Sequence, residues 1–128
     1  MNRTLKKSIR KMNDQNSWWY IKKQQEQQEE EMKKYKPVIC RDGFTMSIQA
    51  GVGMYSRPRT FSAEHYQEVE IGYPSAKESL ILEYAEVPSA PTDTVYAYVP
   101  VDIVTLVIAK HGGMVSGEVP PGVIVLPA

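Results

Sequence analysis

The fold class follows from one stretch, residues 95–113, which read VYAYVPVDIVTLVIAKHGG. Up to residue 99, small or aliphatic residues alternate with tyrosines, as in a half-buried strand. The side chains expected on one face are Val95, Ala97 and Val99, and those on the other are Tyr96 and Tyr98. After Pro100 the residues are apolar nearly all round until Gly112 and Gly113, two helix terminators. We therefore expect a strand over residues 95–99 that leads into a buried helix over residues 101–111.

Three further segments read as strands. Residues 44–50, FTMSIQA, alternate apolar and polar side chains, and residues 68–71, EVEI, do the same before the turn sequence GYPS at 72–75. The apolar run LILEY at residues 80–84 predicts another strand. The predicted fold class is α+β: a small antiparallel sheet of four or five strands, one buried C-terminal helix and an N-terminal helical arm.

The charge distribution divides the chain at Lys36-Pro37, because the residue before a proline disfavours the helical conformation. Residues 1–36 carry ten basic and five acidic side chains, whereas residues 37–128 carry five basic and ten acidic ones. We expect a basic helical arm over 1–36 and a compact body over 37–128 that ends in an apolar tail, residues 117–128. Within the arm, alternating steps of three and four form a seam with a polar centre. The seam residues are Trp18, Ile21, Gln25, Gln28, Met32 and Tyr35.

The arm and the tail are both candidate contacts between copies of this chain. The seam would pair weakly with a partner helix or lie on the body. The tail would either add a strand to its own sheet or dock on a neighbouring subunit. A homo-oligomer formed through either segment is therefore one of the expected partners.

Catalytic and metal-binding signatures are missing from the sequence. There is no nucleophile elbow, no phosphate-binding glycine loop and no cluster of zinc ligands around Cys40, the single cysteine. His65 and His111 are the two histidines that an enzyme would use as a base, and we expect His111 to be a structural residue at a helix end. We predict no enzymatic activity, no cofactor and no metal. A lone cysteine and the lack of an apolar signal or membrane segment favour the cytoplasm, with no membrane partner.

The candidate binding residues are aromatic and arginine side chains. Arg57 and Arg59 flank Pro58 beside Tyr55, and an arginine fork of this kind would clamp a phosphate or an acidic peptide. The alternative is a solvated loop whose arginines pair with Glu64, Glu68 or Glu70. Tyr66 is added because tyrosines are enriched at interfaces. Trp18 and Trp19 are the candidates on the arm, where they would also stack on bases if the partner were a nucleic acid. The acidic second half of the arm makes nucleic acid the less favoured partner.

The body also resembles small uncharacterised proteins encoded by bacteriophages and prophages. The segments that carry the resemblance lie between residues 38 and 117, outside the arm and the tail. They are CRDGFTMSIQA at 40–50, YSRPR at 55–59, VEIGYPS at 69–75, TVYAYVPV at 94–101 and KHGGM at 110–114. The resemblance implies a viral origin and brings no catalytic residues with it.

The function expected from these patterns is binding without turnover. The leading hypothesis is a phage-type protein that inhibits or modulates a host protein, such as a defence protein, or sequesters a small anionic ligand. The alternatives are a virion or assembly protein and a nucleic-acid-binding accessory protein.

Overall fold

The computed structural model describes residue 18 and residues 20–22, 34–60 and 63–126. The chain divides into two units, Met1–Lys33 and Lys34–Ala128. In the first unit the described residues, Trp18 and 20–22, are helical, and Lys22 lies 5.0 Å from the centre of the Trp18 ring. Trp19 and three of the six predicted seam residues, Gln25, Gln28 and Met32, fall outside the described residues.

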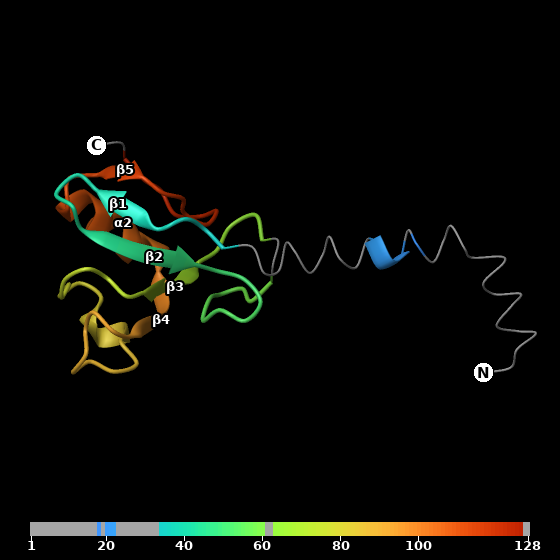
Figure 1. Ribbon diagram of the computed structural model, residues 1–128, viewed down its shortest axis with the longest axis horizontal. Coiled ribbons are helices and arrows are strands. Elements are labelled where there is room, and N and C mark those ends of the chain that lie inside the picture. Colours follow the sequence, from blue (N-terminus) through green and yellow to red (C-terminus); the bar gives the residue numbers. More distant parts are fainter. Residues whose placement is uncertain (1–17, 19, 23–33, 61–62, 127–128) are drawn as a thin grey trace, which may run out of the picture. The chain divides into compact units, whose positions relative to one another are not determined.

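The second unit is an α+β domain, as predicted, built on a five-stranded antiparallel sheet (Figure 1). The strands are β1 (Val38–Cys40), β2 (Thr45–Gln49), β3 (Glu68–Gly72), β4 (Val95–Pro100) and β5 (Met114–Ser116). Their order in the sheet is β4-β3-β2-β1-β5, so β4 and β5 form its two edges. The remaining elements are the 3₁₀ helix η1 (Leu82–Tyr84) and the α-helix α2 (Val101–Lys110).

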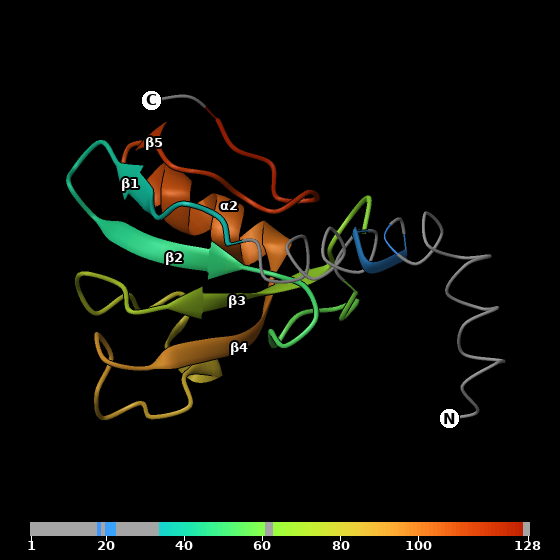
Figure 2. The same cartoon turned by 45° about the vertical axis from the view of Figure 1, so that its right-hand side comes forward.

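Helix α2 lies against one face of the sheet (Figure 2). It begins directly after Pro100, as the sequence predicts, and His111 is its C-cap residue. Its buried residues, Val104, Val107 and Ile108, face the core, but Leu106 is exposed, so the helix is not buried all round. Within the described residues, none of the helices combines the length and the apolar content that crossing a bilayer requires.

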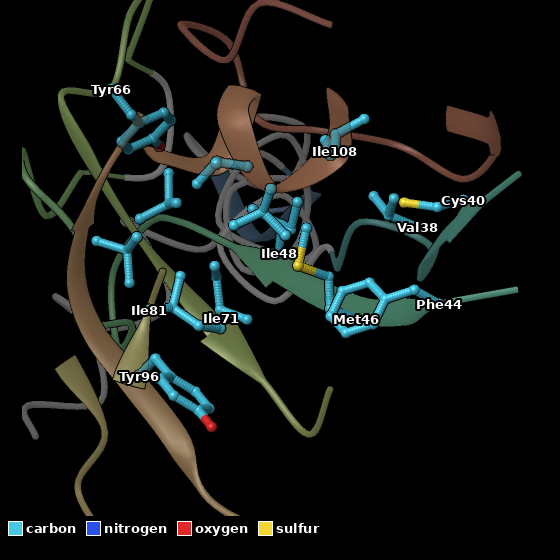
Figure 3. Packing of buried hydrophobic residues seen from close by; sticks show 14 residues of the cluster. Val38, Cys40, Phe44, Met46, Ile48, Tyr66, Ile71, Ile81, Tyr96 and Ile108 are labelled. Atoms are coloured by element: carbon cyan, nitrogen blue, oxygen red, sulfur yellow. The ribbon is translucent and has the colours of Figure 1, made fainter. Parts of the chain in front are cut away.

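The core lies between α2 and the inner side chains of the strands. Figure 3 shows it running from Val38 and Cys40 at one end to Tyr96 at the other, with Ile108 of α2 above the sheet residues. At this end of the core, the hydroxyl of Tyr96 donates to the carbonyl oxygen of Pro91. The packing of the core excludes water from the inner faces of the three long strands, β2, β3 and β4, and so fixes the positions of their outer side chains.

Three sequence predictions about the strands were wrong. Residues 80–84 form no strand: Ile81, Tyr84 and Ala85 each donate to the carbonyl three residues earlier, which gives a turn followed by η1. A five-residue apolar run has no measurable period, so it cannot separate strand from helix. Strands β1 and β5 were missed, because each has only three residues.

The third error concerns the faces of β4. Tyr96 and Val99 are both fully buried, although strict alternation would place them on opposite faces. The register against β3 shifts between Val69 and Ile71, where a bulge inserts an extra residue in β4. Tyr98 lies in this bulge with φ of 52°, and the extra residue turns the side chain of Val99 back toward the core.

The apolar tail packs on its own domain without forming a strand. Glu118 exchanges hydrogen bonds with Lys36, and the N–H of Tyr66 donates to the carbonyl of Pro121. Farther along, Val123 and Val125 pack on the core, whereas Ile124 and Leu126 between and after them are exposed. The alternative of a tail that adds a strand to its own sheet is therefore excluded for the described residues up to 126.

Candidate functional site

The candidate site forms where the β2–β3 hairpin is interrupted. Gln49 pairs with Glu70 of β3, and the next pair of the ladder joins Arg57 to Glu68. These two pairs are two residues apart on β3 but eight residues apart on the strand that faces it. Residues 50–56 therefore leave the ladder as a loop, which holds Tyr55 and is followed directly by Arg57, two of the residues predicted from the sequence.

Hydrogen bonds fix this loop internally and to the sheet. The buried hydroxyl of Ser56 accepts from the N–H of Gly51 at 3.0 Å, which closes the loop on itself. The N–H of Tyr55 donates to Oε1 of Glu70 at 3.1 Å, and its carbonyl accepts from the N–H of Tyr98 at 3.1 Å. The loop is thus attached to both β3 and β4 through its backbone, and Tyr55 is held in place independently of its ring.

The bulge in β4 allows the N–H of Tyr98 to bond to the carbonyl of Tyr55 in the loop. An N–H in a regular ladder would point to the neighbouring strand, but Tyr98 is in the left-handed region and its N–H is bonded to the loop instead. A tyrosine in this region costs about 1–2 kcal/mol relative to ordinary strand geometry. Its presence is a reason to examine the surroundings of Tyr98, since such backbone strain is often found at functional sites.

Three side chains meet at this point, and we call them the Tyr–Arg cluster: Tyr55, Arg57 and Tyr98. The guanidinium carbon of Arg57 lies 5.5 Å from the centre of the Tyr98 ring, within cation–π range. The Tyr55 and Tyr98 rings are 5.9 Å apart with an interplanar angle of 51°. The sequence therefore gave two of the three members, and the structure adds Tyr98.

Glu68 orients the arginine of this cluster. Its Oε1 accepts from Nε of Arg57 at 2.9 Å, and this hydrogen bond raises the pKa of Arg57 further above neutrality. The Arg57 side chain is nevertheless 66% exposed. Among the described residues no other hydrogen bond to the guanidinium is formed, so its terminal N–H groups face solvent. An arginine positioned by a ring and a carboxylate, with donors left over, can bind an anionic group with little further loss of side-chain entropy.

The other predicted binding residues are distributed differently. Tyr66 belongs to the core, 3% exposed, and its hydroxyl donates to the carbonyl of Thr60 at 2.5 Å, so its ring is not part of the surface. Arg59 is exposed, and no described residue pairs with it. Trp18 is exposed in the first unit. The structure thus brings together Tyr55 and Arg57 only.

The sequence offered no signal for Tyr98 as part of a site, since alternation assigned it to one strand face and the bulge places it beside the arginine. Glu64, Glu68 and Glu70 were expected to pair with the arginines if the loop were only solvated, and the structure forms one such pair, Arg57–Glu68. Arg57 thus fits both expectations: it forms a solvated ion pair, and that pair orients it as a binding group.

The histidines occupy unlike environments. His65 is exposed, whereas both ring nitrogens of His111 are engaged by carboxylates, Nδ1 by Asp42 and Nε2 by Glu78. Neither nitrogen of His111 is open to a substrate in this arrangement. No group of three or more histidine, cysteine or acidic side chains suited to holding a metal ion occurs in the part of the chain that the structure describes.

No family model, curated protein or solved structure matches this chain. What the protein does is therefore inferred from the residues of the site and their geometry. The Tyr–Arg cluster joins two exposed side chains to a half-buried one, and the loop, the bulge and the ion pair together hold it in place.

Proposed function

We propose that this chain is a non-enzymatic binding protein of the phage type, which modulates a host protein by contacting an acidic part of its surface through the Tyr–Arg cluster. The observation that carries the proposal is the placement of Arg57 across Tyr98, itself held at φ of 52°. Nothing in the packing of the core requires an exposed arginine at this position.

The composition of the cluster supports a macromolecular partner. Tyrosine and arginine are enriched among the residues that dominate binding energy at protein interfaces, because they offer large contact areas and polar tips. Tyr55 is 38% exposed, so its ring has area left to bury. Its backbone is already fixed by Glu70 and Tyr98, which reduces the entropy that binding would cost.

The local charges indicate the chemistry of the partner. Arg57 already has one carboxylate neighbour, Glu68, and this ion pair is exposed to solvent. A surface ion pair contributes at most about 1 kcal/mol, so a carboxylate or phosphate of the partner can displace Glu68 or share the guanidinium with it. Exposed Arg59, two residues away, would extend the basic contact.

The host and the inhibitory role come from the sequence resemblance to phage-encoded proteins. Small phage proteins without catalytic motifs act mainly by binding host machinery, including defence proteins. Sequestration of a small anionic ligand by the same arginines is the nearest alternative, and it differs from the proposal in the mass of the bound species.

The test is native mass spectrometry of the tagged full chain recovered from a bacterial host. The variants are the double replacement Tyr55→Ala/Arg57→Ala and a control, Lys77→Ala, which removes an exposed positive charge outside the cluster. We expect the wild type and the control to retain a bound protein that the double variant retains at least about tenfold less, a loss of 1.4 kcal/mol or more.

Each other outcome points to another function. Equal retention by all three proteins would refute a role for the cluster. A bound mass of a few hundred daltons lost with Arg57 would indicate a small anion, and an oligonucleotide lost on deleting residues 1–36 would indicate a nucleic-acid protein. A symmetric oligomer with nothing else bound would favour the assembly protein.

A further inference from the structure

A second organised group of side chains lies at the end of α2, around His111. Nδ1 of His111 is 2.6 Å from Oδ2 of Asp42, and Nε2 is 2.7 Å from Oε1 of Glu78. Phe44 stacks on the imidazole, with ring centres 4.0 Å apart and an interplanar angle of 10°. The imidazole is therefore held in plane by two carboxylates and on one face by an aromatic ring.

The hydrogen bonds indicate which protonation state this geometry requires. The second oxygen of Asp42 accepts from the N–H of Phe44, and the second oxygen of Glu78 accepts from the N–H of Leu80 and from Nζ of Lys110. Both carboxylates are thus engaged as acceptors on all sides. For His111 to bond to both of them, each of its ring nitrogens has to carry a hydrogen, which makes it an imidazolium ion.

Three distant segments of the chain are joined by this one ring. Asp42 lies in the turn between β1 and β2, 69 residues from His111, and Glu78 lies between β3 and η1, 33 residues away. Glu78 is 1% exposed and belongs to the long irregular connection from β3 to β4. Near residue 78 the N–H groups of Leu80 and Ile81 both donate to Glu78 itself, and the carbonyl of Ile81 accepts from the N–H of Tyr84.

The other charged groups around the ring do not replace it. Lys110 of α2 reaches Glu78 from solvent, with 48% of its side chain exposed. From the β1–β2 turn, Arg41 packs its side-chain carbons near Gly112, and the buried thiol of Cys40 remains neutral, because burial and Asp42 raise its pKa. Without the charge on His111, buried Glu78 keeps one cation, half-exposed Lys110, among the described residues, and Asp42 keeps none of them.

We propose that His111 is a pH-dependent latch, whose protonated ring holds the segment around Glu78 to the end of α2 and releases that segment when the ring loses its proton. The imidazolium also lies at the C-terminus of α2, where a positive charge is favoured by the helix dipole. A neutral ring keeps one hydrogen, so one of the two attachments is lost. In the released state that hydrogen is on Nδ1, which keeps the bond to Asp42, and the bond from Nε2 to Glu78 is the one that is lost.

The direction of the pH dependence follows from the shifted pKa values of His111, Asp42 and Glu78. Burial lowers the pKa of His111, but the hydrogen bonds that the ring donates to Asp42 and Glu78 outweigh burial and raise it above 6.5, its ordinary value. The latch is therefore complete below 6.5 and is lost as the pH rises through the raised value of the folded state. The pKa of Asp42 is lowered, chiefly by the N–H of Phe44, and the pKa of Glu78 is lowered despite its burial, so both stay ionised over this range.

The test follows hydrogen exchange of individual amides by NMR across the titration of His111, as protection factors corrected for the intrinsic pH dependence. The reporters are the N–H groups of Leu80 and Ile81, and the reference is Ile48 in β2, which pairs with Ile71 of β3. We expect the protection of the reporters to fall about tenfold as His111 is deprotonated, while that of Ile48 does not change.

Two variants distinguish release of the latch from a loss of amide protection that does not depend on His111. In His111→Gln the reporters should be poorly protected at every pH, and in His65→Gln, which removes the other histidine, the pH-dependent loss should persist. A pH-dependent loss that survives in His111→Gln, or that is absent from the wild type, would overturn the proposal. If His111→Gln does not fold, the ¹⁵N shifts of the wild-type ring decide: a neutral tautomer below pH 6.5 is incompatible with the latch.

Discussion

The hydroxyl of Thr105 in α2 lies 2.6 Å from the carbonyl oxygen of Ile124, to which it donates a hydrogen bond. The carbonyl of Val101 in the same helix is farther away, at 3.2 Å. A threonine hydroxyl in a helix commonly bonds back to its own preceding turn. Here the shorter bond goes to the tail, so α2 packs on the sheet with one side and holds residues 123–126 with another.

The docking of the tail depends on a glycine. Gly122 has φ of 105°, and a Cβ at this position would collide with the backbone carbonyl of Tyr66. We expect Gly122→Ala to lower the free energy of unfolding by about 3 kcal/mol or more, from backbone strain and overlap together. Urea unfolding measures this. Gly53→Ala is the matched control, since Gly53 has φ of 85° with nothing within 4 Å and should lose only about 1 kcal/mol. Equal losses would show that the tail does not pack as described.

The backbone of Tyr98 can be tested apart from its ring. Asparagine tolerates the left-handed region, whereas a β-branched residue does not. We therefore expect Tyr98→Asn to fold with nearly the stability of the wild type, and Tyr98→Val to lose about 2 kcal/mol through strain at φ of 52°. In thermal unfolding the two variants should separate clearly. If valine is tolerated as well as asparagine, the bulge is not fixed at this residue. Because Tyr98→Asn also removes the ring under Arg57, it should weaken partner retention without unfolding the chain.

The buried carboxylate of Glu78 should dominate the acid limb of the stability curve. Its pKa is lowered by the N–H of Leu80, by His111 and by Lys110, which together outweigh burial. A lowered pKa contributes stability above the ordinary value of 4.5 and loses it as the pH falls through the folded value. Glu78→Gln should thus cost about 2 kcal/mol or more at neutral pH, because it leaves His111 with one carboxylate. Urea midpoints measured from pH 2 to 7 should converge at the acid end, and a constant difference would contradict this account.

Cys40 should be chemically inert in the folded protein. Its side chain is 1% exposed, and burial raises the pKa of the thiol, with Asp42 adding to the effect. Since the thiolate is the reactive form, alkylation by iodoacetamide at neutral pH should be at least about a hundredfold slower than in denaturant. The rate of thiol loss measures this directly. Fast alkylation under native conditions would mean that β1, which carries Cys40, opens readily.

The sequence predicts the long elements of this fold because their periodicity extends over several residues. The helix after Pro100 is bounded by a proline and a glycine pair, and β2 by strict alternation around Met46 and Ile48. Strands of three residues carry no period, and β1 and β5 are fixed only by their pairing with each other and with β2. Gln49 was expected outward and polar; it is buried because its amide bonds to both backbone groups of Tyr35.

The candidate site was only half predictable for a similar reason. Tyr55 and Arg57 stand out in the sequence because the donor fork of an arginine beside an aromatic residue can bind an anionic group. Tyr98 could be joined to them only through a register shift of one residue in β4, which no local pattern records. The latch shows the same limit, because Asp42, Glu78 and His111 are separated by 36 and 33 positions and each has an ordinary explanation when taken alone.

The position of β1 between β2 and β5 bears on how the domain folds as it is synthesised. β1 can pair with β2 within a few residues, but its other edge waits until Met114–Ser116 has left the ribosome. Until then that edge offers unpaired backbone groups to any extended segment nearby. Contacts between such distant residues also slow folding, because the intervening loop has to close first. Residues 114–126 thus control the time at which the sheet closes, and a chain stalled before them would carry an open edge in its middle strands.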